Sequence, residues 1–349
     1  MNCADKQRAV RERGAMKGET ISGNTGIGAE LRVGCKINLT LRITGVRPNG
    51  WHELDTVFLP LPEPFDTLRL IPGDGDGLAL HCDTPGIDCA DNTLTKAYRL
   101  FAEATGFRPG VEAHLVKGIP HGAGLGGGSA DAAALLGWLN GRAPEPLPSD
   151  TLAGLAARVG ADVPFFLYNV PCRATGIGDR LVPCPEWLAE AGVAGAGLVL
   201  LCPGERVSTP WAYAAWDRNN PLTEERNGAI TRASQSLFGG TSSIRWLENS
   251  FEPSVFEAFP RLRMFRERLL REGQRVLPVR TVPGCGRRPQ GGGRFSGRRR
   301  GRLWPRIVRF PPFKETFVTL GCSQAGKATG FGPVIRGFKS FRPSHFFAL

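Results

Sequence analysis

A run of glycines placed directly before a helix start is the part of this 349-residue chain best suited to chemistry. Residues 120–133 read Pro-His-Gly-Ala-Gly-Leu-Gly-Gly-Gly-Ser-Ala-Asp-Ala-Ala, with five glycines from Gly122 to Gly128. Glycine adopts the positive φ angles of a tight loop, and a following helix offers unpaired N–H groups and the positive end of its dipole. The run therefore predicts a phosphate-binding loop.

Three other interpretations of the glycine run fit the sequence less well. A P-loop needs a lysine directly before its Ser or Thr, and here Gly128 precedes Ser129. A dinucleotide fold matches the glycine spacing, but a proline-rich segment at 143–148 stands where a second strand with a ribose-binding acid should follow. A flexible linker is disfavoured because apolar elements flank the glycines on both sides.

Long ordered motifs on both sides of the loop carry a resemblance to a known family. They are the Lys36-Ile-Asn-Leu stretch, residues 43–56, and the Gly-Ala-Asp-Val-Pro-Phe-Phe-Leu stretch at 160–167. Together with the loop they resemble the 4-diphosphocytidyl-2-C-methyl-D-erythritol kinases of the GHMP superfamily, over residues 30–273. The resemblance implies an α+β fold of two domains with the active site in the cleft between them.

The same resemblance implies an activity. It is ATP-dependent phosphorylation of the 2-hydroxyl of 4-(cytidine 5'-diphospho)-2-C-methyl-D-erythritol, a step of the non-mevalonate isoprenoid pathway. ATP would be the co-substrate, with Mg²⁺ as its counter-ion, and the small-molecule substrate would be the other partner. No membrane partner is expected, and nothing in the sequence points to an oligomeric state.

The resemblance implies a catalytic pair made of Asp162 and Lys36. Asp162 follows a glycine that ends a helix and precedes Val-Pro-Phe-Phe, so its carboxylate is expected among apolar neighbours. A carboxylate in this role takes the proton of the acceptor hydroxyl, while the lysine orients that hydroxyl and offsets its developing charge. Without the resemblance, an Asp at this place would be interpreted as a helix cap.

Substrate contacts are implied in two aromatic segments and on the strand that carries Lys36. The residues are Asn38, Trp51, His52, Thr209 and Tyr213. The family usually has tyrosine where this chain has Trp51, so a contact through a phenol hydroxyl is lost. Trp211 competes with Tyr213 for stacking on the base, and for either ring a place in the core is the alternative.

ATP binding is assigned to the loop and to two residues outside it. Asn92 matches a family position near the adenine and Lys117 adds charge, with a helix cap and a solvated strand residue as their alternatives. The Ser129 hydroxyl serves as an N-cap or contacts phosphate or magnesium, and the role of Asp131 stays open. The expected ATP contacts are Asn92, Lys117, Pro120, Gly122, Ala123, Gly124, Leu125, Gly126, Gly127, Gly128 and Ser129.

Composition divides the chain into four parts. We expect a loose leader at 1–29, an N-terminal kinase domain at 30–187, a partial C-terminal kinase domain at 188–273 and a basic, disordered tail at 274–349. The net charge is +12, but the tail holds 16 of the 44 Lys and Arg residues and one of the 32 acids. The remaining body is mildly acidic, so its charge does not indicate a nucleic-acid partner.

The tail departs from the family pattern, in which a Gly-Ser-Gly strand follows a helix like the one at 253–271. A shifted reading frame in GC-rich DNA is the favoured interpretation, because charge, periodicity and motif all change near one point. A basic arm that binds nucleic acid or anionic lipid is the other. The alternative functions are thus a degenerate kinase homologue that binds nucleic acid and another polyol kinase of the superfamily.

Apolar patterning predicts the remaining elements. Strands are expected near 31–43, 54–60, 111–117 and 198–202, and helices after the loop, at 92–104 capped by Asp91, from a Ser149-Asp150 cap to Gly160, and near 210–217, 223–238 and 253–271. Nine cysteines without a Cys-x-x-Cys pair indicate reduced thiols and a cytoplasmic location. No metal-ligand residues are expected, because His81, Cys82 and Cys89 do not have zinc-site spacing.

Overall fold

The chain forms two compact units in a computed structural model. The first unit is Met1–Glu186 with Pro283–Cys285, and the second is Trp187–Val282 with Gly286–Leu349. Within them the structure describes residues 28–85, 87–185, 198–201, 205, 207–221, 248–271, 275–277, 307–309, 318–320 and 346–348.

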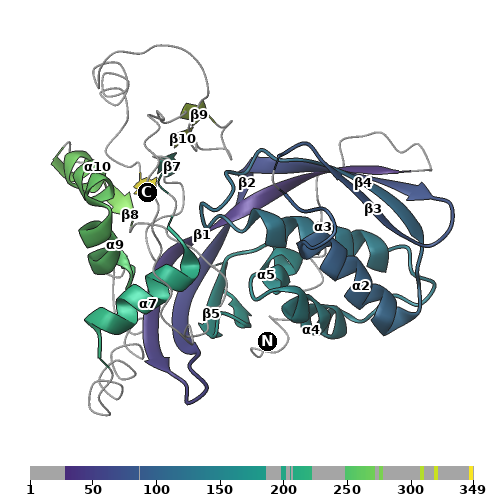
Figure 1. Cartoon of the computed structure of the whole chain (residues 1–349), viewed down its shortest axis with the longest axis horizontal. Helices are drawn as coiled ribbons and strands as arrows, with labels where there is room; N and C mark the ends of the chain where they lie inside the picture. The colour runs from purple at the N-terminus through teal and green to yellow at the C-terminus, as the bar shows by residue number, and fades with distance from the viewer. Residues whose placement is uncertain are drawn as a thin grey trace. The chain divides into compact units, whose positions relative to one another are not determined.

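A six-stranded sheet forms one layer of the first unit (Figure 1). Its strands are β1 (Ala29–Val46), β2 (His52–Gly73), β3 (Gly77–Cys82), β4 (Gly110–Val116), β5 (Cys172–Gly176) and β6 (Arg180–Pro183). The order is β3-β4-β2-β5-β6, with β1 also paired to β2. The pairing is antiparallel except between β3 and β4. The sequence did not predict β3, β5 or β6 as strands.

The long hairpin of β1 and β2 is the element that carries the predicted catalytic lysine. The two strands run antiparallel from the Ala29–Leu70 pair to the Val46–His52 pair. Register shifts leave Gly34, Leu39 and Thr44 of β1 without a partner on β2. Residues 52–61 of β2 pair without interruption, so alternate side chains of that stretch share one face of the sheet.

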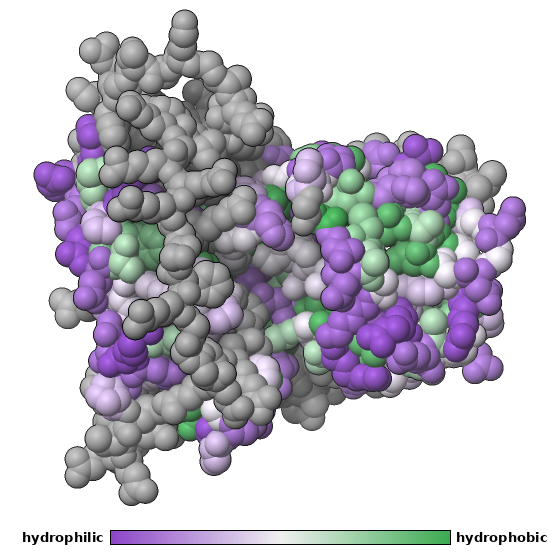
Figure 2. Space-filling view, viewed as in Figure 1, coloured by the Kyte–Doolittle hydropathy of each residue, from purple (hydrophilic) through white to green (hydrophobic). Residues whose placement is uncertain are grey.

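Four helices gather on one face of this sheet (Figure 1). They are α2 (Thr93–Thr105), α3 (Gly127–Asn140), α4 (Ser149–Val159) and α5 (Val163–Tyr168). α3 is almost entirely buried, with small alanines that allow close packing against β1, β2, α2 and α5. One continuous apolar core joins these helices to the sheet, while hydrophilic residues cover much of the visible surface (Figure 2). Segregated strands and helices confirm the predicted α+β class.

Two of the predicted helix starts are wrong by one residue. The N-cap of α2 is Asn92, whose side chain accepts hydrogen bonds from the N–H groups of Leu94 and Thr95, and not Asp91. Ser149 is the first residue of α4, because Pro148 takes the N-cap position. The predicted stop of that helix at Gly160 is confirmed.

The second unit combines short strands with three described helices. The helices are α7 (Thr209–Asn219), α9 (Glu252–Ala258) and α10 (Pro260–Arg271). The predicted helix at 253–271 is two helices, because Pro260 has no N–H to donate into the preceding turn. None of the described helices is long and apolar enough to cross a membrane.

Five strands of the second unit form a sheet in the order β8-β11-β7-β10-β9. They are β7 (Leu198–Leu201), β8 (Arg275–Leu277), β9 (Ile307–Arg309), β10 (Val318–Leu320) and β11 (Phe346–Ala348). Four of them fall in the range expected to be a disordered tail. The rest of 274–349, the leader and the predicted helix at 223–238 lie outside the described residues, so the expectations for them stay predictions.

Candidate active site

The glycine loop has the backbone that its composition predicts. Gly122, Gly124 and Gly126 have φ angles of 73°, 71° and 74°, in the region that side chains disfavour. Gly126 is the N-cap of α3 and offers no side-chain cap, so the first N–H groups of the helix remain without a capping side chain. Ser129 is therefore inside the first turn, and the expectation that it caps the helix is wrong.

Two loop glycines stand where a side chain would not fit. A Cβ on Gly126 would lie 2.9 Å from Cζ of Phe166 and 3.1 Å from Cγ of Lys36. A Cβ on Gly127 would lie 3.1 Å from Oδ2 of Asp66. A side chain at Gly126 would press on Phe166 and Lys36, and one at Gly127 would press on Asp66. Glycine at these two positions therefore lets the loop approach both charged residues closely.

The structure brings the predicted catalytic pair together beside this loop. The backbone N–H of Lys36 donates to the carbonyl of Leu125 at 2.9 Å, which fixes β1 against the loop. Nζ of Lys36 lies 3.1 Å from Oδ2 of Asp162, and the two side chains are 1% and 9% exposed. Burying both charges costs desolvation free energy, so stability alone does not explain this ion pair.

Asp162 does not have the structural role that its position in the sequence suggests. It occupies the N-cap of α5, but its side chain makes no cap hydrogen bond. Val163, Pro164 and Phe165 directly after it are buried. The carboxylate is therefore directed to Lys36 rather than to the helix, and the helix-cap interpretation is wrong.

A chain of polar groups continues from Lys36 across the hairpin. Its Nζ donates to Oδ1 of Asn38 at 3.0 Å, and Nδ2 of Asn38 donates to Oγ1 of Thr56 at 3.0 Å. Thr56 in turn donates to the carbonyl of Thr40 at 2.5 Å. The ring of Phe58 lies 4.3 Å from the Lys36 ammonium, a cation–π contact. Sequence reasoning missed Thr56 and Phe58, because the register between β1 and β2 that brings them to Lys36 and Asn38 is defined only in the folded hairpin.

Comparison with known proteins identifies the family. The description "GHMP kinases N terminal domain" matches residues 92–169. Over 243 residues the chain is 50% identical to the 4-diphosphocytidyl-2-C-methyl-D-erythritol kinase of Nitratidesulfovibrio vulgaris strain DP4, covering 70% of this chain and 83% of that protein. It is 46% identical over 259 residues to the enzyme of that name from Lawsonia intracellularis, with the same two coverages.

A solved structure agrees with these relatives. A crystal structure of 4-(cytidine 5'-diphospho)-2C-methyl-D-erythritol kinase matches with a TM-score of 0.52 and 33% identity. The match covers 70% of this chain and 84% of that one. The chain belongs to the 4-diphosphocytidyl-2-C-methyl-D-erythritol kinase family. The predicted resemblance is confirmed.

His52, which was expected to contact the substrate, lies in a row of buried side chains along β2. His52, Leu54, Thr56 and Phe58 alternate along β2 and share a face, and all four are buried. His52 thus continues the row that begins beneath Lys36. Its neighbour Trp51 lies in the turn of the hairpin, where its carbonyl accepts a hydrogen bond from Arg47 N–H at 2.7 Å.

The N-terminus of α2 reaches the glycine loop through a residue that the sequence did not indicate. Oγ1 of Thr93 donates to the carbonyl of Gly128 at 2.8 Å. Asn92, expected near the adenine, uses its side-chain oxygen as the helix cap and donates from Nδ2 to Asp88 O at 2.8 Å. The cap alternative is therefore what the structure shows for Asn92.

Lys117, expected to add charge for ATP, lies between two carboxylates. Its Nζ contacts Oδ2 of Asp66 and lies 2.8 Å from Oδ2 of Asp131. Burial lowers the pKa of Lys117, but the charges of Asp131 and Asp66 outweigh this effect and the net pKa lies above 10.5. Burial raises the pKa of Asp131 from 3.8 to about 7; the Lys117 charge opposes that rise and the Asp66 charge adds to it.

The expected base-stacking residues belong to the second unit. Tyr213 is 1% exposed on α7, and its ring meets Phe251 edge-on with centroids 4.9 Å apart. This packing agrees with the core alternative for Tyr213, and a role at the base stays a prediction. Trp211 is partly exposed and packs edge-on against Phe259 at 5.4 Å, and Thr209 begins the helix. The roles of Trp211 and Thr209 stay predictions.

Proposed function

We propose that this chain transfers the γ-phosphoryl group of ATP to the 2-hydroxyl of 4-(cytidine 5'-diphospho)-2-C-methyl-D-erythritol, in the non-mevalonate isoprenoid pathway. The observation that carries the proposal is the Lys36–Asp162 pair at 3.1 Å beside the loop glycine Gly126. A base, a cation and a phosphate-binding backbone in contact are the parts that phosphoryl transfer requires. Membership of the family supports the choice of substrate.

The proposed chemistry assigns one step to each group. Asp162 accepts the proton of the 2-hydroxyl as its oxygen forms a bond to the γ-phosphorus, and the bond from that phosphorus to the β-phosphate oxygen breaks to release ADP. Lys36 stabilises the oxygen anion that develops during this transfer. Asn38 holds the ammonium at 3.0 Å, and Thr56 holds Asn38, so the cation is preorganised.

The loop would bind the ATP phosphates through backbone N–H groups between Gly124 and Ser129. The positive φ angles and the absence of a side-chain cap at α3 fit this role. Mg²⁺ would neutralise phosphate charge when bound with ATP, and Ser129 is the hydroxyl that the loop offers it. Among the described residues no group of three or more His, Cys, Asp or Glu could hold a metal ion.

The substrate would lie along the β2 row. His52 and Phe58 are six positions apart on the strand, a span of about 20 Å at the usual rise per residue. An extended nucleoside diphosphate of that length would reach from Trp51 and His52 at the base to Lys36 at the reacting hydroxyl. A cytoplasmic location stays a prediction.

The experiment is a product assay with the full chain. ATP and 4-(cytidine 5'-diphospho)-2-C-methyl-D-erythritol are supplied together, and the phosphorylated product is identified by mass spectrometry and phosphorus NMR. We expect one new phosphomonoester and one ADP per turnover. Mevalonate, homoserine and galactose are the comparison acceptors. Phosphorylation of one of these instead, or of none of the four alcohols, would overturn the proposal.

A further inference from the structure

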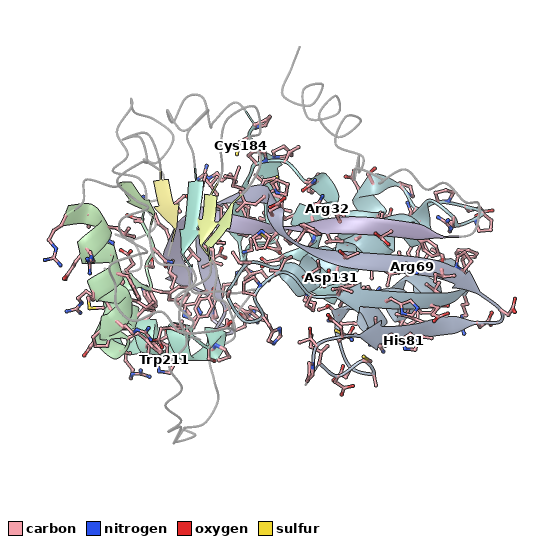
Figure 3. All side chains as sticks on the ribbon, turned by 90° about the horizontal axis from the view of Figure 1, so that it is seen from above. Arg32, Arg69, His81, Asp131, Cys184 and Trp211 are labelled. Atoms are coloured by element: carbon pink, nitrogen blue, oxygen red, sulfur yellow. The ribbon has the colours of Figure 1, made fainter. Side chains whose placement is uncertain are left out.

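A second cluster of buried charges lies against the glycine loop and has no part in the proposed chemistry. It consists of Asp66 on β2, Lys117 after β4, and Asp131 on α3, which is labelled in Figure 3. The side chains of the three residues are 0%, 9% and 1% exposed, in that order. Two carboxylates and one ammonium are costly to bury, so their contacts need an explanation.

The three residues join the two ends of the loop. Oδ1 of Asp66 accepts hydrogen bonds from the N–H groups of Gly118 and Ile119, each at 2.8 Å, directly before the loop. Asp131 stands on α3, directly after the loop. Lys117 contacts both carboxylates, so a single ammonium connects the entry of the loop to its exit and to the sheet beneath.

Direct contact between Lys117 and ATP fits these surroundings poorly. The ammonium already has two carboxylate partners, and a phosphate that approached it would meet their negative charges at close range. Oδ1 of Asp131 is buried and has no hydrogen-bond partner among the described residues. An oxygen in that position is more stable when its carboxyl carries a proton, which agrees with the raised pKa of Asp131.

We propose that Lys117 is a positioning residue, which holds the phosphate loop in its binding shape through Asp66 and Asp131 before ATP arrives. The proposal rests on the proposed function only in that the loop binds ATP phosphates. Gly127 shows how close the cluster stands, since a Cβ there would lie 3.1 Å from Oδ2 of Asp66. A loop fixed in advance loses less entropy on binding.

The test compares Lys117→Met with Lys96→Met in the full chain. Lys96 is the control because it is an exposed lysine whose Nζ joins α2 to α4, by donating to Val159 O at 2.8 Å, rather than to a loop residue. Amide hydrogen exchange of residues 118–129 is measured without ligand, and the ATP dissociation constant is measured by calorimetry. For Lys117→Met we expect faster exchange confined to the loop and ATP binding weakened by up to about 100-fold. Lys96→Met should change neither.

Two other outcomes of this comparison would each overturn the proposal. Unchanged loop exchange with lost ATP affinity would mean that Lys117 contacts the nucleotide directly, and unchanged values for both would mean that the cluster does not position the loop. If Lys117→Met does not fold, the double variant Lys117→Met/Asp131→Leu removes one of the charges left unpaired, and the same measurements apply. ATP binding without phosphorylation of the cytidine substrate would overturn the proposed function and leave this inference intact.

Discussion

Two clusters of lysine and aspartate adjoin the glycine loop, and their carboxylates are engaged differently. Gly126 lies against Lys36 of the first cluster, and Gly127 lies against Asp66 of the second. In the first, one lysine faces one carboxylate, and Asp162 makes no cap hydrogen bond to its helix. In the second, one lysine faces two carboxylates, and Asp66 also accepts two backbone N–H groups.

This difference separates the carboxylate that we propose as the base from the carboxylates that hold the loop. Hydrogen bonds from backbone N–H groups favour the charged form of a carboxylate and so make it a weaker base. Asp66 accepts two such bonds, whereas Asp162 makes no cap hydrogen bond to its helix. Residue type and burial alone would have grouped all of these residues together, so the useful distinction lies in what each oxygen is bonded to.

The largest effect should come from Asp162→Asn. Without a base, turnover should fall by about 100-fold to 10,000-fold, while ATP binding changes little. Steady-state kinetics with the cytidine substrate and ATP calorimetry provide the two measurements. Asp131→Asn is the matched change in the other cluster and should lower turnover far less. Equal losses in the two variants would remove the distinction drawn between the clusters.

Replacing the lysines should lower stability more in the second cluster than in the first. Removing one partner of a buried ion pair costs about 3–5 kcal/mol because the other charge is left unpaired. Lys36→Met leaves one such carboxylate and Lys117→Met leaves two, so the second variant should unfold at the lower urea concentration. Circular dichroism during urea unfolding measures both. If Lys36→Met unfolds at the lower urea concentration, the Lys36–Asp162 pair contributes more to stability than the Lys117 cluster does.

Substitution of single glycines tests how closely the loop meets the Lys36 cluster. Gly126→Ala places a Cβ 2.9 Å from the Phe166 ring and 3.1 Å from Lys36 Cγ, at a φ of +74°. Gly122→Ala meets the same backbone strain at +73° but nothing within 4 Å. Both should lose about 1–2 kcal/mol of stability from the left-handed backbone. Gly126→Ala should also lower turnover, because the new Cβ would press on Lys36. Equal turnover in the two variants would show that this contact does not disturb Lys36.

The sequence was sufficient for the first cluster and insufficient for the second. Lys36, Asn38 and Asp162 could be identified because they fall in ordered motifs that resemble a family, and the structure places them within hydrogen-bond or ion-pair distance. The loop backbone followed from the glycines themselves.

The second cluster depends on pairing that a local pattern does not contain. Asp66 reaches Lys117 across 51 positions of sequence, because β2 pairs with β4 in a register that only the folded sheet defines. For the same reason Thr56 was missed and Lys117 was expected at the nucleotide. The sequence could not decide between base and core for Tyr213, because stacking aromatics and core aromatics have the same spacing along a helix.

The second cluster should also make the stability of the protein depend on pH. Burial raises the pKa of Asp131 to about 7, against an ordinary value of 3.8. Between those values the folded chain keeps a proton that the unfolded chain releases, so this group makes the protein less stable as pH rises from about 4 toward 7. The free energy of unfolding should therefore fall by up to about 1.4 kcal/mol per pH unit from this group alone.

Asp131→Asn has no proton to lose, so the difference between wild type and variant isolates the group from other titrating residues. Urea unfolding at several pH values measures both curves. Parallel curves would show that Asp131 is ionised in the folded protein throughout, and that Lys117 balances the charges of both carboxylates.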